Sequence, residues 1–102
     1  MLFKKTISFY ECKDYFIMNS RELKPTIQDE TNSTITFVMS KGKRSIKVCL
    51  KSIGNKILVD ITDSFYLLRI PQETFSDIKK YKPYILQIVG KLYDELEIEN
   101  SR

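Results

Sequence analysis

Alternation of apolar and polar residues predicts β-strands through the middle of the chain. In three segments every second residue is apolar, which is typical of strands with one buried face. These segments are residues 35–39, 46–50 and 57–61. Gly42 and Gly54 lie in the short polar stretches between them, and glycine supplies the positive φ that a tight hairpin needs. The pattern therefore predicts a three-stranded antiparallel meander with one apolar and one polar face.

Further strands are predicted on either side of this meander. Residues 3–10 alternate in the same way, and residues 15–18 read as a short return strand. Residues 65–70 are apolar on both faces, which is typical of a strand that lies between the core and a helix. Residues 19–33 show no clean period, so we expect a long connection there, with one helical turn at 20–23.

The end of the chain has helical spacing instead. Apolar residues three apart predict a short helix over 72–81, and Pro83 is expected to start a second helix because the residue before a proline disfavours the α region. The apolar face of the second helix consists of Ile85, Ile88, Val89, Leu92 and Leu96. Gly90 within it is interpreted as a close approach to the sheet. Acidic residues crowd the C-terminal end, where the helix dipole disfavours them, so residues 94–102 are predicted to form a frayed acidic tail.

These elements predict a single α+β domain over residues 1–102, an antiparallel sheet of five to six strands backed by C-terminal helices. Strands within 7–39 and within 46–70 fall in a similar order, which suggests a faint three-strand repeat. The apolar runs are too short to cross a bilayer, and the N-terminus lacks the apolar core of a signal peptide. We therefore expect an intracellular, cytoplasmic protein without membrane contact.

Basic residues gather in the predicted meander. The 29 residues from Thr31 to Val59 hold six basic side chains and no Asp or Glu, on a chain of formal net charge +4. The six are Lys41, Lys43, Arg44, Lys47, Lys51 and Lys56. Alternate residues of a strand share a face, so we expect Lys47, Lys51 and Lys56 on one exposed surface with the other three beside them. Such a surface matches a phosphate backbone and would bind it by counterion release.

Two other readings of these side chains stay open. Lysines on a sheet can simply keep it soluble and discourage pairing at its edges, or they can bind an acidic protein partner. Aromatic side chains on the polar side would favour binding, because the bases of single-stranded nucleic acid stack on them. Tyr10, Tyr15 and Tyr66 are the candidates; Tyr66 is more readily placed in the core with its hydroxyl at the rim, and Tyr10 is kept in the candidate interface.

The order strand–strand–strand–helix from Ile46 to Ile88 resembles the unit of the Whirly, PUR and transcriptional-cofactor families of single-strand-binding proteins. Its closest local match is residues 66–75, YLLRIPQETF, since those families run a strand directly into a helix with an aromatic in its first turns. The resemblance implies sequence-tolerant binding of single-stranded nucleic acid or RNA. The chain departs from these families because it lacks their turn signature between strands and interrupts the helix at Pro83.

The composition also carries a resemblance. The chain is rich in Ile and Lys, lacks alanine, and has few of the amide residues that are chemically labile at high temperature. In these respects it resembles small proteins of viruses that infect hyperthermophilic archaea, which implies a viral protein.

No catalytic, metal or cofactor site is predicted. The chain has no histidine, and Cys12 and Cys49 lie far apart, which excludes zinc fingers, Cys–His nucleophiles and serine triads. Both cysteines are interpreted as small buried residues, with a disulfide as the alternative. Asp60 and Asp63 flank a strand end and could bind a divalent cation, but without a third ligand a structural role at a turn is favoured.

The sequence thus predicts a non-catalytic binding protein, of one of two kinds. The first binds single-stranded nucleic acid or RNA through the basic residues of the meander and Tyr10. The second is a protein–protein interaction module that binds a peptide in a groove or at an exposed sheet edge, together with residues 19–33, by β-augmentation. A homodimer is left open in both cases.

Overall fold

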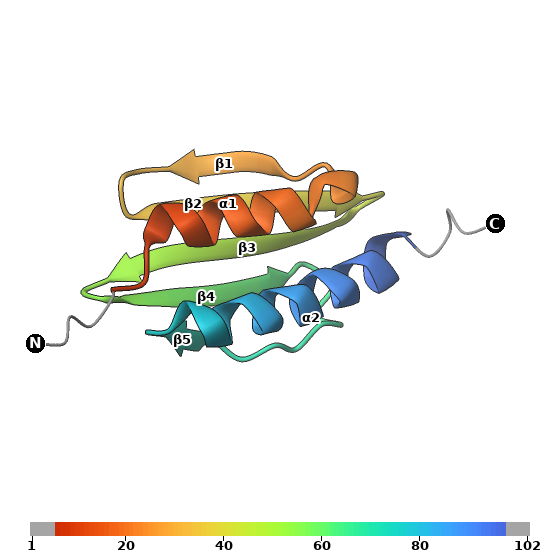
Figure 1. The fold of residues 1–102 in the computed structure, drawn as a ribbon. Helices are drawn as coiled ribbons and strands as arrows, with labels where there is room; N and C mark the ends of the chain where they lie inside the picture. Colours follow the sequence, from red (N-terminus) through yellow and green to blue (C-terminus); the bar gives the residue numbers. More distant parts are fainter. Residues whose placement is uncertain (1–5, 98–102) are drawn as a thin grey trace, which may run out of the picture.

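Two helices lie against one face of a five-stranded antiparallel sheet in the computed structural model, which describes residues 6–97 (Figure 1). The elements are α1 (Phe9–Asn19), the 3-10 turn η1 (Arg21–Leu23), β1 (Thr26–Glu30), β2 (Thr34–Lys41), β3 (Arg44–Ile53), β4 (Lys56–Asp63), β5 (Glu73–Phe75) and α2 (Ile78–Glu97). The strands follow one another across the sheet in chain order. The predicted α+β class, with an antiparallel sheet backed by a C-terminal helix, is confirmed.

The predicted meander corresponds to β2, β3 and β4. Gly42 and Gly54 form the tight turns between these strands with φ of 61° and 59°, a region that favours glycine. Phe37 faces Val48, which faces Ile61, and the neighbouring rows repeat this apolar pairing. All three side chains are buried beneath the helices. The alternation of apolar residues therefore set the register of the sheet, because a slip by one residue would turn them all to solvent.

Strands predicted over residues 3–10 and 15–18 are wrong, because residues 9–19 form helix α1. Residues 1–5 lie outside the described part of the chain. The helix begins where the Ser8 side chain accepts a hydrogen bond from the backbone N–H of Glu11, at 3.2 Å. Phe9, Cys12 and Phe16 then lie on one buried face. The faint three-strand repeat suggested by the sequence required strands before residue 19, and residues 9–19 form a helix instead.

The C-terminal helix has the predicted apolar face, but it is one helix rather than two. Asp77 caps its start by accepting a hydrogen bond from the N–H of Lys79 at 2.9 Å, so Pro83 falls inside the helix. Both Pro83 and Lys79, four residues earlier, are exposed, so water can reach the carbonyl that the missing N–H of proline leaves free. The predicted short helix over 72–81 is therefore replaced by β5 and the first turn of α2.

Three smaller expectations also change. A Cβ on Gly90 would meet no atom within 4 Å, so this exposed glycine marks no close approach to the sheet. The helix continues through Glu97 into the predicted acidic tail, and residues 98–102 lie outside the described part. Within the connection predicted over 19–33, the helical turn appears as η1, and an edge strand, β1, was missed.

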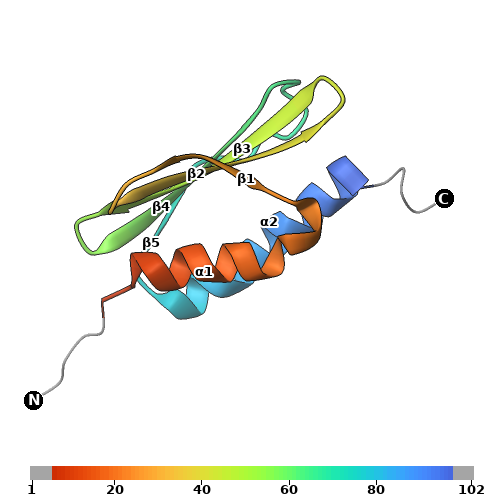
Figure 2. The same ribbon diagram turned by 90° about the horizontal axis from the view of Figure 1, so that it is seen from above.

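The two helices are joined to each other as well as to the sheet (Figure 2). The Tyr81 hydroxyl of α2 donates a hydrogen bond of 2.6 Å to the backbone carbonyl of Cys12 in α1. The Cys12 side chain is buried between the elements, and this burial raises the pKa of its thiol to about 12. Cys49 lies on the other side of the sheet, so both cysteines are free. Among the described residues, neither helix is both long and apolar enough to cross a membrane.

Candidate nucleic-acid interface

Both helices cover the same face of the sheet, and no described element covers the opposite face (Figure 2). We call this opposite surface the open face. Its side chains alternate with the buried ones along the three central strands. They are Thr34, Thr36, Val38, Ser40, Ser45, Lys47, Cys49, Lys51, Ile53, Lys56, Leu58, Asp60 and Thr62.

Three of the predicted basic residues lie together on the open face. Lys47 and Lys51 come from β3, four residues apart, which spans about 13 Å along a strand. Lys56 comes from β4, where it is the cross-strand partner of Ile53. All three are exposed, and none of them makes an ion pair with a residue that the structure describes. Their positive charges are therefore left to solvent or to a ligand.

Acidic side chains interrupt this surface. Asp60 faces Cys49, in the row between Lys47 and Lys51, and Asp29 of β1 lies at the far end of the same row, opposite Thr36. The open face thus has three rows that contain a lysine, and the row that contains carboxylates lies between the rows of Lys47 and Lys51. An anionic ligand would follow the lysines rather than spread over the whole sheet.

The other predicted residues lie elsewhere. Arg44 and its cross-strand partner Lys41 point to the helix side, and Arg44 is buried. Lys43 is exposed in the turn at the end of the open face. Tyr10 is exposed on α1, with the Lys13 ammonium 5.0 Å from its ring, and so lies away from the sheet surface. The structure therefore brings together Lys47, Lys51 and Lys56, but not Lys41, Arg44 or Tyr10.

Arg44 is held inside the protein by two carboxylates. Its Nε and Nη2 donate to Oδ1 and Oδ2 of Asp63 at 3.0 and 2.6 Å, and its Nη1 lies 2.8 Å from Oε1 of Glu95 on α2. The guanidinium lowers the pKa of the Asp63 carboxyl well below its usual range, and it does so more strongly than burial raises it. The group thus fixes β3, β4 and α2 to one another.

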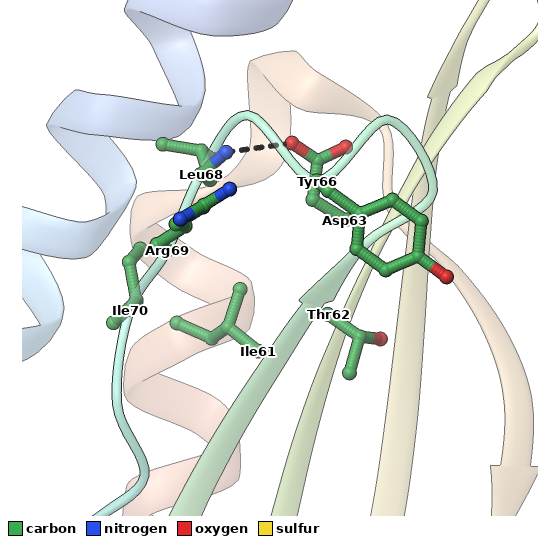
Figure 3. A pocket seen from close by; sticks show the side chains of 7 residues that line it. All are labelled: Ile61, Thr62, Asp63, Tyr66, Leu68, Arg69 and Ile70. Carbon is green, nitrogen blue, oxygen red and sulfur yellow. Dashed lines mark hydrogen bonds between the residues drawn. The ribbon is translucent and has the colours of Figure 1, made fainter.

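Asp63 also shapes the chain that follows it. We call residues 64–70 the tip loop. The backbone N–H of Phe65 donates to Oδ1 of Asp63 at 3.0 Å, and that of Leu67 donates to Oδ2 at 3.0 Å. The N–H of Leu68 also donates to Oδ2, at 2.8 Å, and this bond is drawn in Figure 3. These bonds take the donors that a strand would have used in a sheet. The predicted strand over residues 65–70 is therefore wrong, and β5 forms only after the loop.

The tip loop presents aromatic and apolar side chains to solvent. Tyr66 is 78% exposed and has a φ of 57°, a conformation that residues other than glycine rarely adopt. Phe65 and Leu67 beside it are 49% and 67% exposed. The expectation that Tyr66 belongs to the core is wrong. Sequence reasoning missed it as a surface residue, although an Asp at a strand end followed by Ser, as at Asp63-Ser64, is a common turn signal.

A pocket of about 360 Å³ lies between the tip loop and the end of β4. Its lining comprises Ile61, Thr62, Asp63, Tyr66, Leu68, Arg69 and Ile70. In Figure 3 the Tyr66 ring lies on the Thr62 side of β4, whereas Leu68 and Ile70 lie on the side of α2. Thr62 is also the cross-strand partner of Lys47, so the pocket adjoins the open face.

The two aspartates considered for a metal ion cannot share one. Asp60 lies on the open face and Asp63 on the helix side of the same strand. Across residues 6–97 there is no cluster of three or more His, Cys, Asp or Glu that could hold a metal.

Comparison with family models, with curated proteins and with solved structures found no match. The likenesses to single-strand-binding families and to archaeal viral proteins therefore stay predictions from the sequence. What the chain can bind has to be argued from its own surface.

Proposed function

We propose that the protein is a non-catalytic binder of single-stranded nucleic acid, which lies along the open face. The observation that supports this most is the set Lys47, Lys51 and Lys56. These lysines are exposed on one face and have no ion-pair partner among the described residues. An intracellular location, which the sequence predicts, would give the protein access to such a ligand.

The chemistry of this face suits a phosphate backbone better than base pairs. Lysine ammonium groups bind phosphates and release counterions, and this binding is independent of sequence. Hydroxyl groups of Thr34, Thr36 and Thr62 lie among the lysines and can donate to phosphate or sugar oxygens. A single strand can bend to follow the rows of lysine and avoid Asp60, whereas a stiff duplex cannot.

Salt dependence tests the proposal. The wild-type protein and a Lys47→Gln/Lys51→Gln variant are titrated into a labelled single-stranded oligonucleotide at several salt concentrations. The slope of log K against log salt is expected to fall by about 1.4 in magnitude in the variant, since each phosphate contact contributes about 0.7 for a single strand. A Lys80→Gln/Lys91→Gln variant carries the same charge change on exposed positions of α2 and is the matched control.

The control variant is expected to keep the wild-type slope. Equal losses in the two variants would mean that net charge alone drives binding, and the open face would have no special role. Absence of wild-type binding at low salt would contradict the proposal altogether.

A protein or peptide partner is the second candidate, and one observation favours it. Strand β1 is exposed along its whole length and lies at one edge of the sheet, so its outer side has no strand partner among the described residues. An extended peptide could add there by β-augmentation. A partner bound in this way would stay bound at high salt, which separates this candidate from the first.

A further inference from the structure

We infer that the pocket beside Tyr66 is a nucleobase-binding position, in which a base stacks on the Tyr66 ring. The inference rests on the proposed binding of single-stranded nucleic acid and adds where a base is held. Proteins that bind single strands without sequence preference combine a positively charged track with aromatic side chains on which bases stack. The open face supplies the track, and the tip loop supplies the ring.

The ring is held out by the structure rather than left loose. Tyr66 is 78% exposed, and its backbone keeps a φ of 57°. The three hydrogen bonds from the tip loop to Asp63 fix the chain on both sides of it, and Arg44 fixes Asp63 in turn. Unusual backbone conformations that the surroundings enforce are concentrated at binding sites. An exposed aromatic in such a conformation is ready to receive a flat ligand.

The pocket has the walls that a base requires. Ile61, Leu68 and Ile70 provide apolar surface, while Thr62 and Arg69 provide polar groups at its rim. Arg69 is exposed and makes no ion pair with a residue in the described range, so it can meet a phosphate or a base edge. The Asp63 carboxylate is fully buried and already accepts five hydrogen bonds, so it presents little free negative charge to the ligand.

The edge of β4 adds main-chain groups. This strand pairs with β5 only from Ile57 to Val59, so its outer edge from Asp60 to Thr62 has no strand partner among the described residues. Asp60 and Thr62 turn their N–H and C=O groups toward β3, so Ile61, which lines the pocket, is the residue of this edge whose main-chain groups point outward. They can pair with the polar edge of any base, which fits binding without strong sequence preference.

The pocket is also placed correctly relative to the lysines. Lys47 and Thr62 are direct cross-strand partners, about 4.5–5.5 Å apart at their Cβ atoms. A strand that follows Lys51 and then Lys47 would therefore bring its next nucleotide to the tip loop. Tyr10, the aromatic residue expected from the sequence to stack, lies on the helix side and has no such connection.

The test compares two labelled ligands of about ten residues, a thymidine oligonucleotide and a deoxyribose-phosphate chain of the same length without bases. The wild-type protein is expected to bind the base-bearing ligand about 5- to 150-fold more tightly, as stacking of a single base allows. Tyr66→Asn is expected to lose most of this preference, since asparagine tolerates a positive φ but has no aromatic ring. Tyr66→Phe is expected to keep it, and Tyr10→Gln is the matched control.

The outcomes separate the two proposals. If the wild type binds both ligands equally while Lys47→Gln/Lys51→Gln weakens both, the open-face function stands and the base site is wrong. An unchanged preference in Tyr66→Asn overturns the base site in the same way. If the wild type binds neither ligand at low salt, both proposals fail. Amide chemical shifts of Thr62, Tyr66 and Arg69 on titration with thymidine monophosphate give a readout that does not depend on chain length.

Discussion

Arg44 and Asp63 form two parallel hydrogen bonds between the start of β3 and the end of β4, and both side chains are buried. A bidentate, charge-assisted pair of this kind is strong, but its stability depends on both partners. Removing one would leave the other charge buried without compensation. The same pair holds the loop that carries Tyr66, so its loss would reach the proposed base site.

Asp63→Asn should therefore be strongly destabilising. The free energy of unfolding is expected to fall by about 3–5 kcal/mol, the typical cost of breaking a buried ion pair by removing one member. Urea unfolding followed by circular dichroism measures it. Asp60→Asn, on the open face of the same strand, is the matched control and should stay within about 0.5 kcal/mol of wild type. Similar small effects of both substitutions would contradict the structural role of the pair.

Stability should also depend on pH through the same carboxyl. The pKa of Asp63 in the folded protein is lowered below that of an unfolded Asp, about 3.9. Its contribution is therefore complete above the unfolded pKa and is lost as pH falls from about 5 downward. The free energy of unfolding, measured between pH 2 and pH 6, is expected to fall more steeply for the wild type than for Asp63→Asn. Parallel curves would show that other carboxyls cause the loss.

Gly90 offers a stabilising substitution. It lies in the middle of α2, is exposed, and has free space around the position of a Cβ. Gly90→Ala is expected to raise the free energy of unfolding by about 1 kcal/mol, the difference in helix propensity. Gly42→Ala should do the opposite, because Gly42 has a φ of 61° that alanine tolerates poorly. A lower melting temperature for Gly90→Ala would mean that this part of α2 contacts a further element.

The cap of α1 can be tested in the same way. Ser8→Ala removes the oxygen that accepts from the N–H of Glu11, and the expected loss is about 1 kcal/mol. Ser8→Asp keeps an acceptor at this position and should restore most of the stability. If both variants unfold like the wild type, the hydrogen bond at 3.2 Å contributes little.

The central sheet and the face of α2 could be predicted from the sequence because their signals are local and repeated. Apolar residues recur every second position through β2, β3 and β4, and the glycines at 42 and 54 mark the turns. Helix α1 was missed because Ile7 and Phe9 alternate with polar residues like a strand. Ser8 and Glu11, spaced as in a capping box, were the better signal.

The candidate site was predictable only in part, for two physical reasons. Lys47, Lys51 and Lys56 follow from alternation alone. Arg44 lies two residues before the buried Ile46, so alternation along β3 also places Arg44 on the helix side. A buried arginine needs a carboxylate partner, and that partner, Asp63, is 19 residues away. No local sequence pattern identifies it. The tip loop depends on a side chain that competes with the sheet for backbone donors, and hydrophobic periodicity carries no information about such competition.

The hydrogen bond from Tyr81 to Cys12 has a consequence for the order in which the chain folds. Its partners are 69 residues apart, whereas the central strands are joined by short turns and can pair early. We expect docking of the first helix to be among the last steps. Tyr81→Phe should then accelerate unfolding several-fold, in proportion to a loss of about 1 kcal/mol, and leave the refolding rate nearly unchanged in stopped-flow measurements.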